Sequence, residues 1–374
     1  MRDRQPLKLW VMTNEYHPDI IGGLGIVATQ LTRSLVRAGA SATVIVTGSS
    51  SRLVVSKAGR GLQIVRLPNS PRYYHGASGT YRASAVLEAA AKAGAVVPDI
   101  IHVHSTEFAA AAAEAGRKYD VPIVYTCHSI SSAGLRSREG RRQTRLIRTA
   151  ARIAAPSWWQ AGQIGGRYPG ARTRIAVIPN GVQRVSGKVR GPSPRLLYAG
   201  RIIPSKGIEE LIRAVGRLSR QSRDVRLTVI GDGPPVYHRR MRILARRLGI
   251  AGRIRWLRHQ SHAALQRRFA AYGAVIVPSR QESFCLVALE AMARSVPLVS
   301  TISGGLQEFV NSRNAEVIRS IDEAEIARAV AAMRDRPDQT RQRSVRARMT
   351  ASRYLWPVIA RRYSSLFASL RKRR

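Results

Sequence analysis

The stretch AVIVPSRQESFCLVALEAM, residues 274–292, joins an apolar segment to an alanine- and leucine-rich one through a short polar loop. Residues 274–279 are rich in Val and Ile, which favour buried strands, whereas residues 285–295 have the composition of a helix. The same alternation recurs along the chain. It predicts further strands at residues 8–14, 41–48, 100–105, 122–129, 152–157, 174–181, 195–201, 226–233, 253–259 and 297–302, and helices at residues 25–40 and 207–219. Strands of this kind linked by helical crossovers form parallel sheets, so the sequence predicts an α/β fold with doubly wound sheets.

The length of the chain and a connector near its middle predict two domains. At 374 residues the chain exceeds the size at which a single core usually keeps growing. A Gly-, Pro- and Ser-rich connector, VSGKVRGPSPR at residues 185–195, separates two series of strands. We therefore predict one domain at residues 1–187 and a second at residues 188–350. The last segment, residues 351–374, carries its apolar residues on one stripe, which predicts an amphipathic helix that packs back on the body.

The most unusual global property is a formal charge of +41, from 63 Lys and Arg residues against 22 Asp and Glu. A field this basic attracts nucleic acid, anionic lipid headgroups or phosphorylated ligands. However, 56 of the basic residues are Arg, and they are spread along the whole chain rather than gathered in a tail. We therefore favour a compositional origin for the charge.

Three further observations bear on location. No apolar run reaches the roughly 18 residues of a membrane-spanning helix. The N-terminus runs directly into a strand-like segment and lacks the features of a signal peptide. Two cysteines, Cys127 and Cys285, do not make a disulfide framework. We expect a cytoplasmic protein.

A glycine-rich loop, GGLG, separates the first strand from the first helix. Gly22, Gly23 and Gly25 have no Cβ, so the backbone can approach a phosphate closely, and the N-terminus of the following helix favours an anion. The pattern is not G-x-G-x-x-G, so a dinucleotide-binding fingerprint is not supported. A tight turn without a ligand is the alternative interpretation.

Other strand ends also carry polar or cationic residues. Arg201 follows a strand and Lys206 precedes a helix, and two such cations can hold a diphosphate from two directions. The order SKG is not that of a P-loop, and two surface cations are the alternative. Gly233 lies in a GDGP turn after a strand, which is a weak signal. His128 ends the strand at 122–129, and the carboxyl ends of strands are where α/β sheets bind ligands. A purely structural histidine is equally compatible with that position.

Glu282 and Glu290 flank the start of the helix in the opening stretch. A helical span of eight residues would separate their Cα atoms by about 12 Å. Paired carboxyls of glycosidases lie roughly 5–10 Å apart, so an acid/base pair acting on one bond is disfavoured. We interpret the two glutamates as contacts at the two ends of one elongated ligand, with the helix N-terminus facing an anion between them. A nucleotide sugar has this layout.

Taken in order, the Gly-rich loop, the strand-end His, the GR…KG and GDGP segments and the two glutamates resemble the family 4 retaining glycosyltransferases with the GT-B fold. The GGLG loop is also similar to that of bacterial glycogen synthases. The resemblance covers nearly the whole chain and includes PNGV at residues 179–182 and SGGLQEFV at residues 303–310. It implies two Rossmann-like domains that face each other across a cleft. The first domain would be on the acceptor side, the second would bind the nucleotide-sugar donor, and the C-terminal helix would cross back to the first.

The resemblance implies a role for each of the residues singled out above. His128 would lie at the reaction centre, and Glu282 would contact hydroxyls of the transferred sugar. Arg201 and Lys206 would neutralise the diphosphate leaving group. The donor-binding candidates are Gly22, Gly23, Gly25, Gly233, Ser283, Phe284, Cys285, Leu286 and Glu290, the last on the ribose hydroxyls. Tyr16, Tyr73 and Tyr74 are the acceptor-side candidates.

The resemblance also implies the chemistry. A hexose-type sugar would move from a nucleotide diphosphate sugar, with a UDP-sugar as the expected donor and no cofactor. The sequence has no convincing Asp-x-Asp, so two cations would act in place of a metal ion. Same-face attack would retain the anomeric configuration, because the acceptor hydroxyl would give its proton to the departing phosphate. The acceptor would be a carbohydrate, a small molecule or a lipid-linked compound.

The sequence departs from the family pattern at two positions. Ile21 stands where glycogen synthases have Lys before the two glycines, which argues against an α-glucan synthase. Ala315 stands where the family usually has Gly, in a turn that we expect to be peripheral.

Two alternatives remain from other classes. A basic nucleic-acid or anionic-surface binding protein on the same fold would explain the charge, but aromatic residues are only 6%, which is sparse for base stacking, so we do not expect nucleic acid. A catalytically silent relative is disfavoured because the motif positions are filled. The Arg-rich segment at residues 135–153 has three interpretations. It faces the acceptor, it is a solvated helix, or it faces an anionic membrane surface, and the last would place the protein at the inner membrane face.

Overall fold

The computed structural model describes residues 6–185, 189 and 191–371. Its packing divides the chain into two compact units: unit 1 is Met1–Gly181 together with Trp356–Arg374, and unit 2 is Val182–Leu355. The boundary predicted at residues 187 and 188 lies outside the described residues, and the packing divides the chain after Gly181. Each unit has its own sheet with helices, so the prediction of two doubly wound α/β domains is confirmed.

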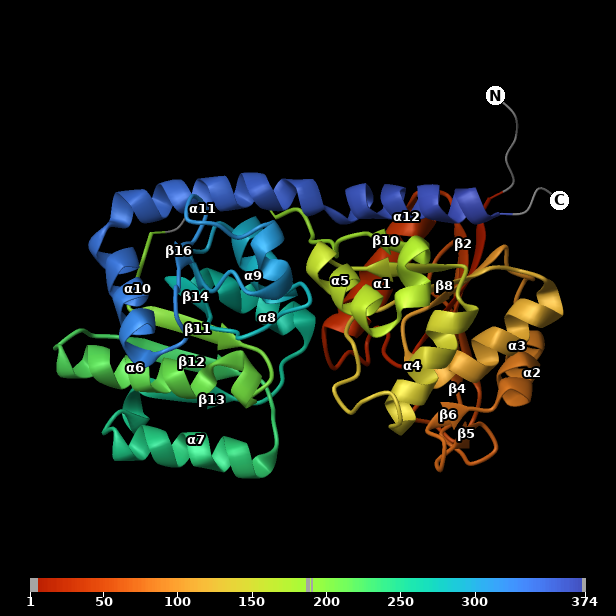
Figure 1. The fold of residues 1–374 in the computed structure, drawn as a ribbon, viewed down its shortest axis with the longest axis horizontal. Coiled ribbons are helices and arrows are strands. Elements are labelled where there is room, and N and C mark those ends of the chain that lie inside the picture. Colours follow the sequence, from red (N-terminus) through yellow and green to blue (C-terminus); the bar gives the residue numbers. More distant parts are fainter. Residues whose placement is uncertain (1–5, 186–188, 190, 372–374) are drawn as a thin grey trace. The chain divides into compact units, whose positions relative to one another are not determined.

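Unit 1 contains an eight-stranded sheet in the order β10-β9-β8-β7-β1-β2-β4-β3. Strands β2, β4, β8 and β10 of this sheet are labelled in Figure 1. Its strands are β1 Lys8–Thr13, β2 Ser41–Thr47, β3 Val54–Lys57, β4 Leu62–Leu67, β7 Ile100–Val103, β8 Ile123–Thr126, β9 Arg152–Ala155 and β10 Ile175–Val177. All neighbouring pairs are parallel except the edge pair β3–β4. The strand order reverses between β1 and β7, and the crevice at such a point is where doubly wound sheets bind ligands.

Two layers of helices cover this sheet. The helices of unit 1 are α1 Gly23–Arg37, α2 Ala83–Lys92, α3 Ala109–Tyr119, α4 Arg138–Thr149, α5 Trp158–Arg167 and α12 Trp356–Leu370. Residues of α2, α3, α4 and α5 share one hydrophobic core with the sheet. The C-terminal helix α12 packs against α1 and buries Ile359, Tyr363 and Phe367, as its amphipathic stripe predicts. A small hairpin, β5 Tyr74–His75 with β6 Thr80–Tyr81, was not predicted.

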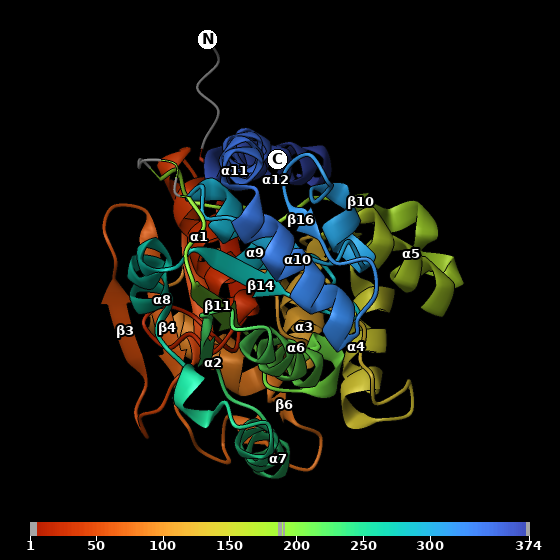
Figure 2. The ribbon, with the colours of Figure 1, turned by 90° about the vertical axis from the view of Figure 1, so that its left-hand side faces the viewer.

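Unit 2 contains a six-stranded, all-parallel sheet in the order β13-β12-β11-β14-β15-β16. Its strands are β11 Arg195–Ala199, β12 Arg226–Ile230, β13 Ile254–Leu257, β14 Ala274–Val277, β15 Leu298–Ser300 and β16 Glu316–Val317. Its helices are α6 Ile208–Arg220, α7 Pro235–Arg247, α8 His262–Arg268, α9 Leu286–Ala293, α10 Glu323–Asp335 and α11 Pro337–Ala351. Helices α6, α7 and α10 share a core with the sheet, α6 lying beside α10 (Figure 2), whereas α9 packs against α11. The strand order reverses between β11 and β14, which predicts a ligand site at their carboxyl ends.

The Arg-rich segment at residues 135–153 forms α4. Within this segment α4 itself spans Arg138–Thr149, and its apolar residues Leu146 and Ile147 are buried in the core of unit 1, as is Ile153 in β9, whereas Leu135, which precedes the helix, is 43% exposed. Helix α4 therefore has no exposed apolar face that could insert into a membrane. Among the described residues, no helix is both long enough and apolar enough to cross a membrane.

Candidate functional site

In unit 2 the loops that follow β11 and β14 contact each other directly. The Arg280 N–H donates to the Ser205 carbonyl at 2.9 Å. Gly207 has φ 65°, and a Cβ at this position would lie 2.1 Å from the Pro278 carbonyl oxygen. Glycine is therefore required at position 207, because its φ is positive and because a Cβ would clash with the Pro278 carbonyl oxygen. The contact brings the two strand ends predicted to bind phosphate and sugar to the same place.

Lys206 and Glu282 form an ion pair at this junction. The distance from Lys206 Nζ to Glu282 Oε1 is 2.6 Å, and the Ser279 hydroxyl donates to the same oxygen at 2.8 Å. The side chains of Lys206 and Glu282 are 17% and 12% exposed, so the pair is largely shielded from water but can still be reached. A shielded charge pair of this kind interacts more strongly with a ligand than two surface charges do.

The backbone around Glu282 is held by the segment at residues 303–306. The Glu282 carbonyl accepts from the Gly305 N–H at 2.8 Å. Gly304 has φ 60°, and a Cβ there would lie 2.2 Å from the same carbonyl oxygen. This close approach explains why the SGGL sequence carries glycine at position 304. In the sequence, this segment stands out only as part of the family resemblance.

Helix α9 begins next to Glu282 with an unusual backbone. Cys285, the residue before the helix, has φ 78°, and no side chain caps the helix N-terminus. Burial, followed by the nearby Glu282 carboxylate, raises the pKa of the Cys285 thiol, so it remains protonated at neutral pH. Phe284 is buried against Phe309, with ring centroids 5.1 Å apart. Phe284 is 1% exposed and Leu286 9%, so both can offer a donor substrate only their backbone, while Ser283 is half-buried.

Glu290 lies further along α9 in a different environment. It is 4% exposed, and its Oε1 is 2.6 Å from His262 Nε2. A carboxylate only accepts hydrogen bonds, so His262 donates. The guanidinium of Arg294 lies over the Phe269 ring at 5.5 Å, and burial lowers its pKa, an effect that Glu290 opposes. Glu282 and Glu290 thus have separate partners. This is compatible with the interpretation that they contact opposite ends of one elongated ligand.

Arg201 and Gly233 lie on the neighbouring strand ends. Arg201 is exposed after β11, and its guanidinium makes no ion pair with any residue that the structure describes. Its carbonyl accepts from the Tyr198 hydroxyl at 2.7 Å. A Cβ at Gly233 would lie 2.1 Å from the Ile202 carbonyl oxygen. The structure thus gives Gly233 a packing role between the loops after β11 and β12, which accounts for the glycine without any ligand.

In unit 1, three histidines gather at the ends of β7 and β8. His104 Nδ1 lies 3.0 Å from His128 Nε2, and His102 Nε2 lies 2.8 Å from the Thr126 hydroxyl. Burial lowers the pKa of His128 to about 4 and that of His102 to about 3, and it holds the pKa of His104 well below its usual value. All three imidazoles are therefore neutral at pH 7. His128, the predicted residue, is half-buried at the strand end where the sequence places it.

The glycine-rich loop of unit 1 already holds a carboxylate. Glu15 Oε2 accepts from the N–H groups of Ile21 at 2.9 Å and Gly22 at 2.8 Å. A Cβ at Gly25 would lie 2.7 Å from this same carboxylate oxygen. We had expected the backbone at Gly22, Gly23 and Gly25 to hold a phosphate. In the structure, glycine at position 25 leaves room for the Glu15 side chain, and the N–H groups of Ile21 and Gly22 bind the Glu15 carboxylate instead of a phosphate.

The three tyrosines predicted on the acceptor side differ in burial. Tyr16 is 0% exposed, its hydroxyl has no partner among the described residues, and burial raises its pKa to about 12. Tyr73 is 7% exposed and belongs to the core of unit 1. The structure therefore argues against the acceptor role expected for both, because their side chains are enclosed. Tyr74 is half-buried at the β5–β6 hairpin and stays a candidate.

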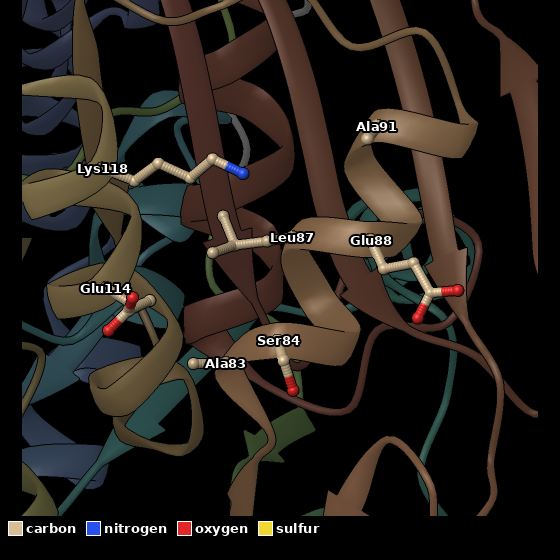
Figure 3. A pocket seen from close by; sticks show the side chains of 7 residues that line it. All are labelled: Ala83, Ser84, Leu87, Glu88, Ala91, Glu114 and Lys118. Carbon is tan, nitrogen blue, oxygen red and sulfur yellow. The ribbon is translucent and has the colours of Figure 1, made fainter.

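Two surface hollows are lined by none of these residues. One, of about 620 Å³, lies between α2 and α3 and is lined by Ala83, Ser84, Leu87, Glu88, Ala91, Glu114 and Lys118 (Figure 3). Its acids already have cationic partners, Glu88 with Arg72 and Lys92, and Glu114 with Arg117. The other, of about 540 Å³, is lined by Asn311, Arg313, Asn314, Arg346, Met349, Thr350 and Arg353. Within the described ranges, no group of three or more His, Cys, Asp or Glu residues could hold a metal ion.

Sequence reasoning missed several residues of these clusters. His104 ends the strand at 100–105 just as His128 ends its neighbour, so the rule that selected His128 could have found it. Glu15 stands between the first strand and the GGLG loop, but a single glutamate at that place matches no motif that would mark it as functional. His262 belongs to no motif in the sequence, and only the fold brings it to Glu290. Arg294 follows Glu290 by four residues at the end of α9, so helical spacing could have found it.

Comparison with known proteins identifies family models and relatives that match this chain. The family model described as "Glycosyl transferases group 1" matches residues 182–349, and that described as "Glycosyltransferase Family 4" matches residues 21–184. A glycogen synthase of Mycobacterium tuberculosis is 27% identical over 98% of this chain and 95% of its own. A D-inositol 3-phosphate glycosyltransferase of Pseudarthrobacter chlorophenolicus is 30% identical over 67% of this chain and 66% of its own.

Solved structures share the fold at lower identity. Anabaena HepE in complex with UDP and glucose has a TM-score of 0.76 at 20% identity and covers 97% of this chain and 100% of its own. The sucrose-phosphate synthase of Thermosynechococcus elongatus has a TM-score of 0.75 at 20% identity and covers 97% and 99%. Since the two family models together span residues 21–349, the chain belongs to the glycosyltransferases of group 1 and family 4 and has their GT-B fold.

Proposed function

We propose that this protein transfers a hexose-type sugar from a nucleotide diphosphate sugar to an acceptor hydroxyl, with retention of configuration and without a metal ion. The observation that carries the proposal is the Lys206–Glu282 pair at the point where β11 and β14 reverse the strand order. A cation and a carboxylate side by side suit the junction of a diphosphate and a sugar, because the first is anionic and the second carries hydroxyls. Preorganised charge of this kind stabilises the charge that develops on a leaving group.

The proposed reaction needs no protein base. The bond between the anomeric carbon and the diphosphate oxygen breaks, and its electron pair leaves with the nucleoside diphosphate. The acceptor oxygen attacks from the same face and forms the new glycosidic bond, and its proton passes to the departing phosphate oxygen. Lys206 and Arg201 would neutralise the diphosphate. His128 is neutral at pH 7, which suits a hydrogen-bonding role towards the sugar rather than proton transfer from an imidazolium.

The two glutamates of the α9 segment would set the orientation of the donor. Glu282 would accept hydrogen bonds from hydroxyls of the transferred sugar, and Glu290, anchored by His262, would accept from the ribose hydroxyls. We propose a UDP-sugar as donor, with no cofactor, because HepE, which shares this fold, was solved with UDP-glucose. The names of the relatives point in different directions, one a glycogen synthase and the other a D-inositol 3-phosphate glycosyltransferase, so we propose the acceptor only as a carbohydrate, small-molecule or lipid-linked hydroxyl compound.

The test is a thermal-shift screen with UDP-, GDP- and ADP-sugars, followed by measurement of nucleoside diphosphate release. We expect one nucleotide series to stabilise the protein and to be consumed, and Glu290→Ala to lose both effects. Asp338→Ala is the matched control, because it also removes a carboxylate from unit 2 but only from a surface pair with Arg341. No stabilisation by any nucleotide sugar would refute the proposal.

A peripheral contact with an anionic surface is a second proposal, and it would place the protein at the inner membrane face. Arg138, Arg141, Arg145 and Arg148 are all exposed and recur on α4 at a spacing of three or four residues. Side chains with this spacing share one face of a helix. The contact would be purely electrostatic, since the apolar residues of α4 are buried.

A further inference from the structure

His104 and His128 form a hydrogen-bonded pair of imidazoles in unit 1. Besides the 3.0 Å contact between His104 Nδ1 and His128 Nε2, the two rings are nearly parallel, at 25° with centroids 5.3 Å apart. His104 is 2% exposed, and its main-chain N–H donates to the Met12 carbonyl at 2.9 Å. The ring of His104 is therefore fixed in the sheet, whereas His128 is only half-buried.

Only one of the two rings can donate in this hydrogen bond. Burial keeps both imidazoles neutral at pH 7, and a neutral imidazole carries a single N–H. Either His128 donates from Nε2 to His104 Nδ1, or His104 donates from Nδ1 to His128 Nε2. The two arrangements differ in the nitrogen of His128 that keeps its proton.

The second nitrogen of His104 distinguishes the two arrangements. His104 Nε2 is buried and has no hydrogen-bond partner in the described part of the chain. If His128 donated, His104 would carry its own proton on Nε2, as a buried donor without an acceptor. If His104 donates, Nε2 is only a bare lone pair. Buried donors without partners are rarer in proteins than acceptors without partners, so the second arrangement is favoured.

We propose that His104 is a positioning residue that holds His128 in the tautomer with its proton on Nδ1. His128 Nδ1 has no partner among the described residues, and it is not among the atoms sealed from solvent. The pair thus presents one N–H donor of fixed identity at the end of β8, where a ligand hydroxyl can accept it. That this ligand is the sugar of the donor rests on the proposed function, whereas the tautomer itself does not.

The tautomer is measured directly by long-range proton–nitrogen correlation spectra of ¹⁵N-histidine-labelled protein at neutral pH, with His128→Gln used to assign the signals. We expect His128 to carry its proton on Nδ1 in the wild type. In His104→Leu the proton should redistribute towards Nε2, because that nitrogen has lost its donor. A proton on Nε2 in the wild type, or an unchanged tautomer in His104→Leu, would overturn the proposal.

The chain offers a matched control for folding effects. His102 is equally buried on the same segment and its ring packs against that of His104 with centroids 4.2 Å apart, but its hydrogen bond goes to Thr126 and not to His104 or His128. His102→Leu should therefore leave the His128 tautomer as it is, and His104→Asn, whose amide nitrogen can take the place of Nδ1, should preserve it. The free energy of unfolding of each variant, from urea titration, shows whether the comparison is made on folded protein; if His104→Leu does not fold, the Asn variant and the wild type decide the tautomer.

A kinetic readout connects the pair to catalysis. With the nucleotide sugar identified by the screen, His104→Leu should lower kcat by about 10–100-fold, the size of effect seen when a residue that orients another is removed. His104→Asn should recover most of the loss, and His102→Leu should remain close to the wild type. Equal losses in the two Leu variants would make His104 a packing residue only. If the wild type turns over no nucleotide sugar, the proposed function fails, and the spectra still decide the tautomer.

Discussion

Lys206 Nζ and Glu282 Oε1 lie 2.6 Å apart although 76 residues separate them in the chain. One was predicted as a partner of the diphosphate and the other as a partner of the sugar. Their contact means that each charge already has a counter-charge before a ligand binds. A ligand that binds Lys206 must compete with the Glu282 carboxylate and must therefore carry more negative charge than one carboxylate. A diphosphate meets this requirement.

Lys206→Met should separate the structural and chemical roles of this pair. We expect kcat for nucleoside diphosphate release to fall by about 10²–10³-fold, as when one charge-stabilising group is lost. The free energy of unfolding should also fall by about 1–3 kcal/mol, because Glu282 is left shielded without its cation. Adding Glu282→Gln should restore stability in urea titrations but not turnover. Recovery of turnover in the double variant would show that Lys206 serves only as a partner of Glu282.

Gly304 is expected to control the position of Glu282. In Gly304→Ala the new Cβ would lie 2.2 Å from the Glu282 carbonyl oxygen at φ 60°. Gly249→Ala has a similar backbone, φ 68°, with no atom within 4 Å, so it is the matched control. The control should lose about 1 kcal/mol of unfolding free energy, and Gly304→Ala roughly 1–3 kcal/mol more from overpacking. Only Gly304→Ala should also lower transferase activity; equal effects in the two variants would contradict this role.

The outline of the fold could be predicted because its central strands are buried on both faces. Strands β11, β12 and β14 read as continuous Val-, Ile- and Leu-rich runs for that reason. The edge strand β3 is exposed along its whole length and has no such signal. The hairpin β5–β6 has two residues in each strand, too few for any period to be recognised.

The candidate site could be predicted only at the level of strand ends. Position after a strand singled out Arg201 and His128, and position before a helix singled out Lys206 and Glu282, but which side chains meet depends on sheet order, which pairs β11 with β14. The burial of Tyr16 and Tyr73 has the same origin. Both stand beside loops in the sequence, and only tertiary packing turns their rings inward.

His262 should influence donor affinity through Glu290. His262→Ala removes the donor 2.6 Å from Glu290 Oε1 and leaves this buried carboxylate free to move. We expect KM for the nucleotide sugar to rise by about tenfold or less with little change in kcat, because ribose contacts contribute equally to the ground and transition states. His259→Ala is the control, since His259 is exposed nearby. A fall in kcat with unchanged KM would place Glu290 at the reacting sugar instead.

The buried histidines predict a loss of stability in mild acid. The pKa of His128 falls from 6.5 in the unfolded chain to about 4 in the folded one, and that of His102 to about 3, both through burial. Below pH 6.5 the unfolded state therefore binds protons that the folded state does not, so the free energy of unfolding decreases as pH falls towards 4. Urea titrations between about pH 7 and pH 5 should show this slope. His102→Gln should reduce it, and an unchanged slope would mean that His102 is protonated when folded.

The exposed arginines of α4 should bind anionic vesicles by charge alone. Arg138→Gln, Arg145→Gln and Arg148→Gln together remove three charges from one helix face whose apolar side is buried. The triple variant should co-sediment less with phosphatidylglycerol vesicles at low salt than the wild type, and raising the salt to about 1 M, where the Debye length is about 3 Å, should abolish wild-type binding. Substituting Arg239, Arg246 and Arg247 on α7 with Gln removes the same charge elsewhere. An equal loss in this control would assign the binding to the net charge of the protein, and binding to phosphatidylcholine vesicles would contradict an electrostatic contact.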